Sequence, residues 1–104
     1  MPKQAQLGVW ERRDNSDRND LANSALALCR AIKAMDGVTS SRFYWYTTDT
    51  IVIWTEGEAS AFDYQPEPNV GKAMFAMSDL AKLKMSWRLS DAKLGEELFK
   101  ASGK

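Results

Sequence analysis

Hydrophobic and polar residues follow two periods along this chain, and the two periods distinguish strands from helices. Alternation with a period of two is typical of strands, whereas apolar residues at intervals of three and four are typical of helices. Polar stretches and breakers, such as residues 14–20 and the loop 57–69 with its two prolines, separate these segments. The pattern predicts strands over 6–13, 38–46, 50–56 and 84–89, and helices over 17–36, 69–82 and 91–102.

The order of these segments predicts the fold. Strand, helix, strand, strand, helix, strand and a final helix correspond to a split βαβ, or ferredoxin-like, arrangement. Right-handed crossovers would place both crossover helices on one face of a four-stranded antiparallel sheet. We therefore expect one α+β domain over residues 1–104, with the strand order 4-1-3-2 and the helices on one face.

The hairpin formed by 38–46 and 50–56 is apolar on both faces. If Thr47 lies opposite Thr50, then Phe43 faces Trp54 and Trp45 faces Val52 on one side. Aliphatic residues suit packing under helices, so we assign the aromatic set to the open face and Met85, Trp87 and Leu89 to the helix side. The set predicted to form a ligand-binding surface or a dimer face is Trp10, Arg12, Phe43, Trp45, Val52, Trp54, Ser86 and Arg88.

An exposed apolar face of this size indicates an interface or a pocket. Each buried aromatic side chain hides about 150–250 Å². At about 25 cal/mol per Å², three tryptophans would contribute about 10 kcal/mol per subunit before the entropy of association is subtracted. We therefore expect a face-to-face homodimer that the substitution Trp45→Ala weakens.

Composition and charge exclude several classes of function. The 104 residues carry 14 basic and 14 acidic side chains, whereas a nucleic-acid-binding protein usually has a basic excess. The single cysteine, Cys29, excludes an internal disulfide, and the absence of histidine removes the commonest metal ligand and general base. No long apolar run or signal-peptide pattern occurs, so we expect a cytoplasmic protein without a membrane or nucleic-acid partner.

The order of elements and the patterning of the strands resemble the dimeric α+β barrel superfamily over about residues 6–102. This superfamily includes antibiotic-biosynthesis-type monooxygenases, stress-responsive barrel proteins and heme-degrading monooxygenases. The resemblance implies ferredoxin-like subunits that pair into a barrel with an internal cavity. Heme-degrading members use a histidine to bind iron, and this chain has none, so we expect no heme and no other cofactor.

The resemblance and the aromatic residues together predict a homodimer that binds a small aromatic or hydrophobic molecule, as a cofactor-independent monooxygenase-like protein. An arginine beside tryptophans, such as Arg12 or Arg88, could hold an anionic oxygen of that molecule. The alternative is a structural or regulatory dimer whose aromatic face is an interface and nothing more. The sequence does not decide whether the protein is an enzyme, and it identifies no catalytic residue.

Overall fold

The computed structural model describes residues 3–62 and 67–90. The helix predicted over 91–102 lies outside the described residues. The elements follow one another as β1 (Lys3–Arg12), α1 (Arg18–Lys33), β2 (Val38–Thr47), β3 (Thr50–Glu58), the short 3₁₀ helix η1 (Ala59–Phe62), α2 (Pro68–Ser78) and β4 (Ala81–Ser90).

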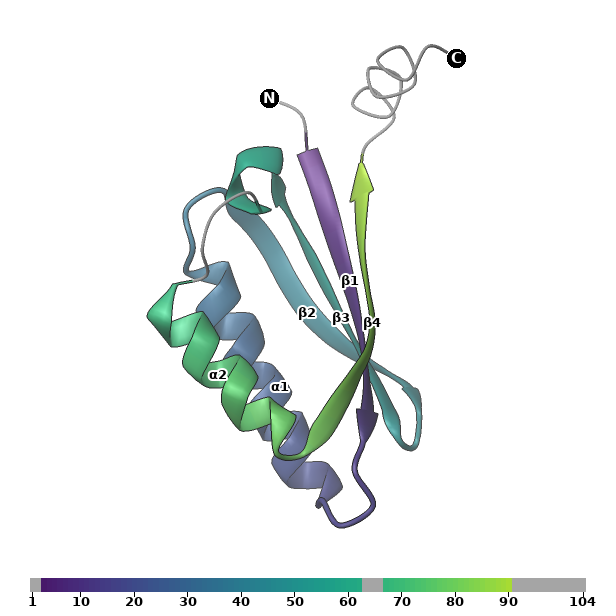
Figure 1. The fold of residues 1–104 in the computed structure, drawn as a ribbon. Helices are drawn as coiled ribbons and strands as arrows, with labels where there is room; N and C mark the ends of the chain where they lie inside the picture. Colours follow the sequence, from purple (N-terminus) through teal and green to yellow (C-terminus); the bar gives the residue numbers. More distant parts are fainter. Residues whose placement is uncertain (1–2, 63–66, 91–104) are drawn as a thin grey trace.

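The four strands form one antiparallel sheet in the order β2-β3-β1-β4, which is the predicted order 4-1-3-2 counted from the opposite edge. Both long helices lie on the same side of the sheet (Figure 1). The predicted ferredoxin-like α+β fold is therefore confirmed. β1 and β3 are the central strands, so each is covered by the helices on one side and contributes to an open sheet face on the other.

Capping residues explain where the helices begin. The side chain of Asp17 accepts hydrogen bonds from the backbone N–H groups of Asn19 and Asp20, at 2.7 and 3.1 Å, so α1 starts at the next residue. In α2 the cap position is Glu67, which forms no capping hydrogen bond through its side chain, and Pro68 occupies the first turn, where its missing N–H costs no hydrogen bond.

The second helix ends earlier than predicted. The pattern favoured a helix to residue 82, but α2 ends at Ser78 and β4 begins at Ala81. Leu80 and Ala81 pack against or within the core, so their apolar character fits the start of a strand as well as the end of a helical stripe. Periodicity alone therefore misplaced this boundary.

Two glycines allow the backbone at the end of β3 to lie close to the start of β2. Gly37 has a φ of 88°, which is the left-handed region that favours glycine. A Cβ atom on Gly57 would lie 2.5 Å from the carbonyl oxygen of Gly37, so the two backbones approach too closely for a side chain. The backbone N–H of Glu58 donates to that same carbonyl at 2.8 Å.

A β-bulge in β2 changes which residues face the helices. Thr47 pairs with Thr50, as predicted, but the next pair is Trp45 with Ile51, which leaves Tyr46 as an extra residue. Because side chains alternate along a strand, one extra residue places the side chains beyond it on the face opposite to the predicted one. The predicted pairing of Phe43 with Trp54 and of Trp45 with Val52 is therefore wrong.

A second bulge lies near the start of β4. Trp10 pairs with Leu83, but its neighbour Val9 pairs with Met85, so Lys84 is the extra residue. Met85, Trp87 and Leu89 lie on the open face, not under the helices as predicted.

Each face of the sheet consists of rows of residues that pair across the four strands. On the helix side, the rows from β2 to β4 are Trp45–Ile51–Trp10–Leu83, Phe43–Ile53–Gly8–Ser86 and Ser41–Thr55–Gln6–Arg88. The prediction that eight named residues share the open face is wrong. Of these eight residues, only Val52 and Trp54 pair with open-face residues. The bulge in β2, which the hydrophobic pattern does not mark, accounts for the misplacement of Phe43 and Trp45. Choosing the open face by aromatic character accounts for the rest.

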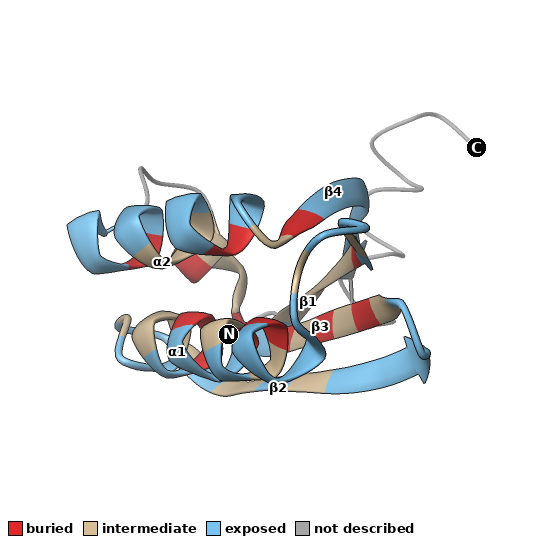
Figure 2. Ribbon diagram, turned by 90° about the horizontal axis from the view of Figure 1, so that it is seen from below, coloured by how far each residue is buried: buried red, intermediate tan, exposed pale blue. Residues whose placement is uncertain are grey.

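The core lies between the sheet and the two helices. Figure 2 shows the buried segments on the sides of α1, α2 and β3 that face one another. The helix face of the sheet contributes Trp10, which is 4% exposed, together with Ile51 and Ile53. The helices cover these side chains with Leu21, Ala25, Leu28, Cys29, Val70 and Met77.

Candidate functional site

A cleft between the sheet and the helices contains two adjacent cavities. One has a volume of about 270 Å³ and reaches from Ile32 and Val38 to Arg88. The other has a volume of about 90 Å³ and lies over Gly8 and Trp10. Gln6 and Met74 line both cavities, so the two lie side by side in one cleft, which we call the helix-side cleft.

The floor of the smaller cavity depends on a glycine. A Cβ atom on Gly8 would lie 3.4 Å from Nε1 of Trp10 and 3.8 Å from Cδ1 of Leu83. The indole nitrogen therefore lies next to the bare backbone of Gly8, at a cavity that both residues line. Trp10 as a whole is 4% exposed, but among the described residues its Nε1 atom is not one of the buried atoms that lack a hydrogen-bond partner. An indole N–H at the wall of a cavity is a donor that a bound acceptor can reach.

A row of polar side chains crosses the helix face of the sheet beside this tryptophan. Ser41 and Thr55 share a hydrogen bond of 3.1 Å between their hydroxyl oxygens. Further along the same row, Nε2 of Gln6 donates to Oγ of Ser86 at 3.3 Å. Nη2 of Arg88 donates to the carbonyl oxygen of Phe62. A sheet face covered by helices is usually apolar, so this polar row distinguishes the cleft from ordinary core.

The cysteine does not contribute a nucleophile. Burial raises the pKa of the Cys29 thiol, and the hydrogen bond with Ser41 opposes this rise in part. A raised pKa keeps the thiol protonated near neutral pH, and the side chain is buried in the core. The residue therefore acts as a small apolar packing group.

The structure brings together three of the predicted site residues, namely Trp10, Ser86 and Arg88, in the helix-side cleft. Sequence reasoning missed Gln6, Gly8 and Thr55, which line the same cleft. The sequence did carry a signal for two of them. Gln6, Gly8 and Trp10 are two residues apart along the first strand, so all three lie on the same face of the sheet. Phe43 packs against the core cluster instead of lining the cavities.

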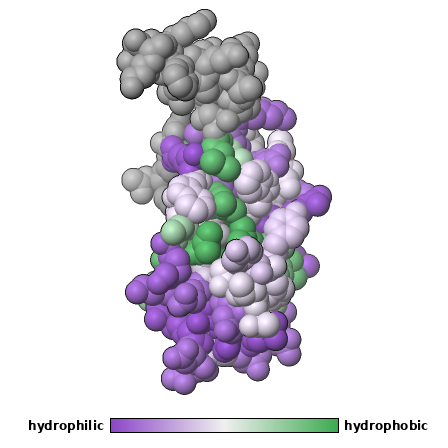
Figure 3. Space-filling view, turned by 90° about the vertical axis from the view of Figure 1, so that its right-hand side faces the viewer, coloured by the Kyte–Doolittle hydropathy of each residue, from purple (hydrophilic) through white to green (hydrophobic). Residues whose placement is uncertain are grey.

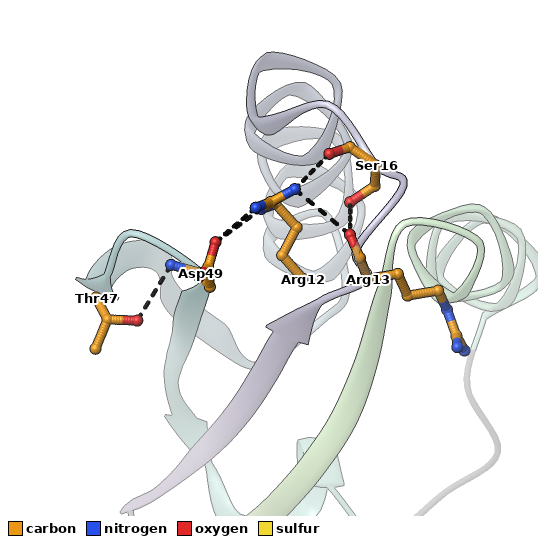
Figure 4. Close-up of polar contacts among 5 residues, drawn as sticks. All are labelled: Arg12, Arg13, Ser16, Thr47 and Asp49. Carbon is orange, nitrogen blue, oxygen red and sulfur yellow. Dashed lines mark hydrogen bonds and ion pairs between the residues drawn. The ribbon is translucent and has the colours of Figure 1, made fainter.

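Arg12 serves the scaffold at the opposite end of the strand (Figure 4). Its Nη2 and Nε atoms lie 2.7 and 3.0 Å from Oδ1 of Asp49 in the β2–β3 turn. Its Nη1 atom donates to the carbonyl oxygen of Ser16 at 2.6 Å. Thr47 holds the same turn, because its Oγ1 accepts the backbone N–H of Asp49 at 3.1 Å. These contacts fasten the turn to the loop that precedes α1.

Trp45 also lies on the helix side, at the sheet edge. The guanidinium carbon of Arg18, the first residue of α1, lies 4.9 Å from the centre of its ring. This is the distance of a cation–π contact. The tryptophan thus anchors the start of the helix and does not belong to the open face.

The open face of the sheet is apolar at its centre. Figure 3 shows a hydrophobic patch over the sheet, with polar surface around it. Trp87 is 48% exposed there, and Nε1 of Trp54 donates to Oε1 of Glu56 at 2.6 Å near the margin. We call this set the open sheet face; its residues are Leu7, Val9, Tyr44, Val52, Trp54, Met85, Trp87 and Leu89.

The part of the chain that the structure describes contains acidic side chains, one cysteine and two long helices. Within it, no group of three or more Cys, Asp or Glu side chains is placed to hold a metal ion. No helix within it is long and apolar enough to cross a membrane.

Comparisons with known proteins bear on the fold. No protein-family model matches the chain, and no curated protein matches its sequence. Among solved structures, SnoaB, a cofactor-independent oxygenase from Streptomyces nogalater, superimposes with a TM-score of 0.74 at 8% identity, over 86% of this chain and 92% of that one.

Two further structures are similar. A protein from Chloroflexus aurantiacus, proposed as an antibiotic biosynthesis monooxygenase, gives a TM-score of 0.65 at 14% identity, over 86% of this chain and 93% of that one. A dimeric protein of unknown function with a ferredoxin-like fold, from Bacteroides fragilis, gives 0.64 at 11% identity, over 85% and 95%. The expected resemblance in topology is confirmed, and at these identities it concerns the fold.

Proposed function

We propose that the protein binds a small planar molecule in the helix-side cleft and assembles as a homodimer through the open sheet face. The observation that carries the first part is the polar row beneath the helices, next to two cavities and the indole N–H of Trp10. Small-molecule sites are concave and largely apolar, with a few polar groups that converge on the ligand. The described lining of the cleft has this composition.

The apolar walls suit a flat ring system. Ile32, Met35 and Val70 from the helix layer lie across from the sheet, and Phe62 lines the same cavity. Met74 lines both cavities, and methionine is an adaptable packing partner for aromatic rings. The likeness to a cofactor-independent oxygenase supports a monooxygenase-like role on such a molecule, which is the finer part of the proposal.

The open sheet face supports the homodimer. Large exposed apolar patches with a polar margin mark protein interfaces. Its central row, Tyr44–Val52–Val9–Met85, presents uncharged side chains on all four strands. A two-fold axis would bring two such faces together as one self-complementary interface. The similar protein from Bacteroides fragilis, which is described as dimeric, supports this assembly.

The binding function is tested by filling the smaller cavity. Gly8→Leu would project a side chain toward Trp10 and Leu83, whereas Gly71→Leu on α2 would meet no atom within 4 Å of its Cβ and serves as the matched control. The measurement is a thermal-shift screen of the unmodified protein and both variants against phenols, quinones and flavins. We expect a compound that raises the melting temperature of the unmodified protein and of Gly71→Leu but not of Gly8→Leu.

Two results would contradict the binding function. One is a screen in which no compound stabilises the unmodified protein. The other is a compound that stabilises Gly8→Leu to the same extent, since that compound would bind elsewhere. Either result would favour the alternative, a structural dimer without a ligand.

A further inference from the structure

One row of the open sheet face has a cation at one end and an exposed tryptophan at the other. From β2 to β4 this row is Arg42–Trp54–Leu7–Trp87. Arg42 is exposed, and its guanidinium has no hydrogen-bond or ion-pair partner within residues 3–62 and 67–90. Trp87 is 48% exposed, and in the same part of the chain no cation lies over its ring. Both ends of the row are therefore available to a partner.

The two ends of this row do not meet within one chain. β2 and β4 are the outer strands, three strand spacings apart, which separates the two backbones by about 14 Å. The side chains of Trp54 and Leu7 lie between them on the same face. A contact between Arg42 and Trp87 thus requires a second copy of the chain.

We infer that, in the proposed homodimer, Arg42 of each subunit stacks on Trp87 of the partner subunit, and that this pair sets the orientation of the two sheets. This orientation rests on the proposed homodimer and adds its symmetry axis and its contact residues. A two-fold axis between the two faces, parallel to the strands and passing between β3 and β1, places each row over the same row of the partner in reversed strand order. Arg42 then lies over Trp87, and the cation–π contact occurs twice.

The same axis gives the apolar residues suitable partners. In the row of Arg42, Trp54 lies over Leu7 of the partner subunit. In the central row, Tyr44 lies over Met85 of the partner subunit, and a thioether against an aromatic ring is a favourable contact. Two halves of the face that differ in side chains, β2 with β3 and β1 with β4, thus complement one another.

The charges near the β2–β3 turn favour this axis over the perpendicular one. The row there is Thr47–Thr50–Glu11–Lys82. With the axis parallel to the strands, both charges lie over threonine hydroxyls of the partner. With an axis perpendicular to the strands through the centre of the face, they lie over Ala5 and Leu89 of the partner, which offer no polar group and make their burial costly. Glu56 lies over Ala5 in the parallel arrangement, but its Oε1 already accepts from Nε1 of Trp54 at 2.6 Å.

The contact is tested through the dissociation constant of the dimer, measured by sedimentation equilibrium on the full chain. We expect Arg42→Gln and Trp87→Leu each to weaken the dimer by at least about 10-fold, because a desolvated cation–π contact is lost twice. Once Trp87 is replaced, the further change Arg42→Gln should have little effect, since its partner is gone. Arg30→Gln removes a charge from the exposed side of α1 and is the matched control, which should leave the dissociation constant unchanged.

A second double-mutant cycle distinguishes a contact between subunits from one within a chain. Trp54 pairs with Arg42 on the neighbouring strand of the same chain, so it is the alternative partner for the guanidinium. We expect the coupling between Arg42→Gln and Trp87→Leu to exceed the coupling between Arg42→Gln and Trp54→Leu. Coupling that is as large with Trp54 would place the contact within one chain and overturn the proposed pair.

Cross-linking tests the axis while leaving the proposed pair intact. In a Cys29→Ala background, a Ser40→Cys protein is mixed with a Leu89→Cys protein and treated with a short bis-maleimide. Ser40 and Leu89 end one row, so the parallel axis brings them together across the interface, and we expect a cross-linked heterodimer by mass spectrometry. The perpendicular axis brings Ser40 over Thr47 of the partner instead. Preferential cross-linking of Ser40→Cys to Thr47→Cys would therefore overturn the proposed orientation.

The outcomes separate the orientation of the dimer from its existence. An Arg42→Gln dimer that is as tight as the unmodified one would overturn the pair while leaving the homodimer standing. An unmodified protein that remains monomeric at the highest concentration would remove the homodimer, and the proposed pair with it. Thermal melting of each variant establishes that it is folded, so that a weaker dimer reports on the interface.

Discussion

The two faces of this sheet are both rich in apolar residues, yet they differ in what interrupts the apolar surface. On the helix side, the row Ser41–Thr55–Gln6–Arg88 places polar groups under a layer of helices and beside cavities. On the open side, the central row contains no charged group, and charges such as Arg42 and Glu56 lie toward the margin. Polar groups inside a covered face indicate a ligand site, whereas apolar groups on an uncovered face indicate a partner.

The largest effect on this comparison is expected from a charge at the centre of the open sheet face. Val9 pairs with Val52 on one side and Met85 on the other, so Val9→Glu would bury an unpaired carboxylate in the proposed dimer. This costs several kcal/mol, and a two-fold interface contains the change twice. We expect a monomer in sedimentation velocity experiments across the micromolar range.

The control for that experiment introduces the same charge elsewhere. Leu26 is exposed on α1, away from the open sheet face, so Leu26→Glu should leave the oligomeric state unchanged. A dimer that survives Val9→Glu would show that the open face is not the interface.

A smaller effect, on stability, is expected from two tryptophans on opposite faces. Trp10→Ala removes a core side chain and should lower the free energy of unfolding by about 3–5 kcal/mol. Trp87→Ala removes a side chain that is 48% exposed in the single chain, so it should cost the monomer far less. Urea unfolding in the Val9→Glu background, where association does not contribute, measures both values. Similar losses in the two variants would contradict the assignment of faces.

The smallest effect is expected at Arg12. Arg12→Met removes the ion pair with Asp49 and the hydrogen bond to Ser16 while keeping the aliphatic stem. The side chain of Asp49 is 55% exposed, so solvent screens the pair and the loss should be about 1 kcal/mol. A double-mutant cycle with Asp49→Asn, repeated at high salt, separates the ion pair from the other contacts. A coupling energy near zero would show that the pair does not fasten the turn.

Much of the architecture could be predicted because it depends on period and order. The stripe of Leu21, Ala25 and Leu28 identifies α1 whatever surrounds it, and the order of elements leaves few topologies. The faces could not be predicted, because Tyr46 shifts the alternation of β2 by one residue without a local sequence signal, and because the open-face residues Met85 and Trp87 are as apolar as residues that pack under helices. Trp54 was placed correctly and Trp10 was not, which shows that aromatic character is a poor guide to the face of a sheet.

The bulge at Lys84 also bears on how copies of this protein can meet. β4 is an edge strand, and edge strands with regular, unpaired backbone groups are templates for pairing with other chains. The extra residue interrupts the ladder, and the exposed side chains of Lys82 and Lys84 place positive charge along the same edge. Edge-to-edge growth into open-ended fibrils is thereby disfavoured, whereas the proposed two-fold contact through the open sheet face would close on itself.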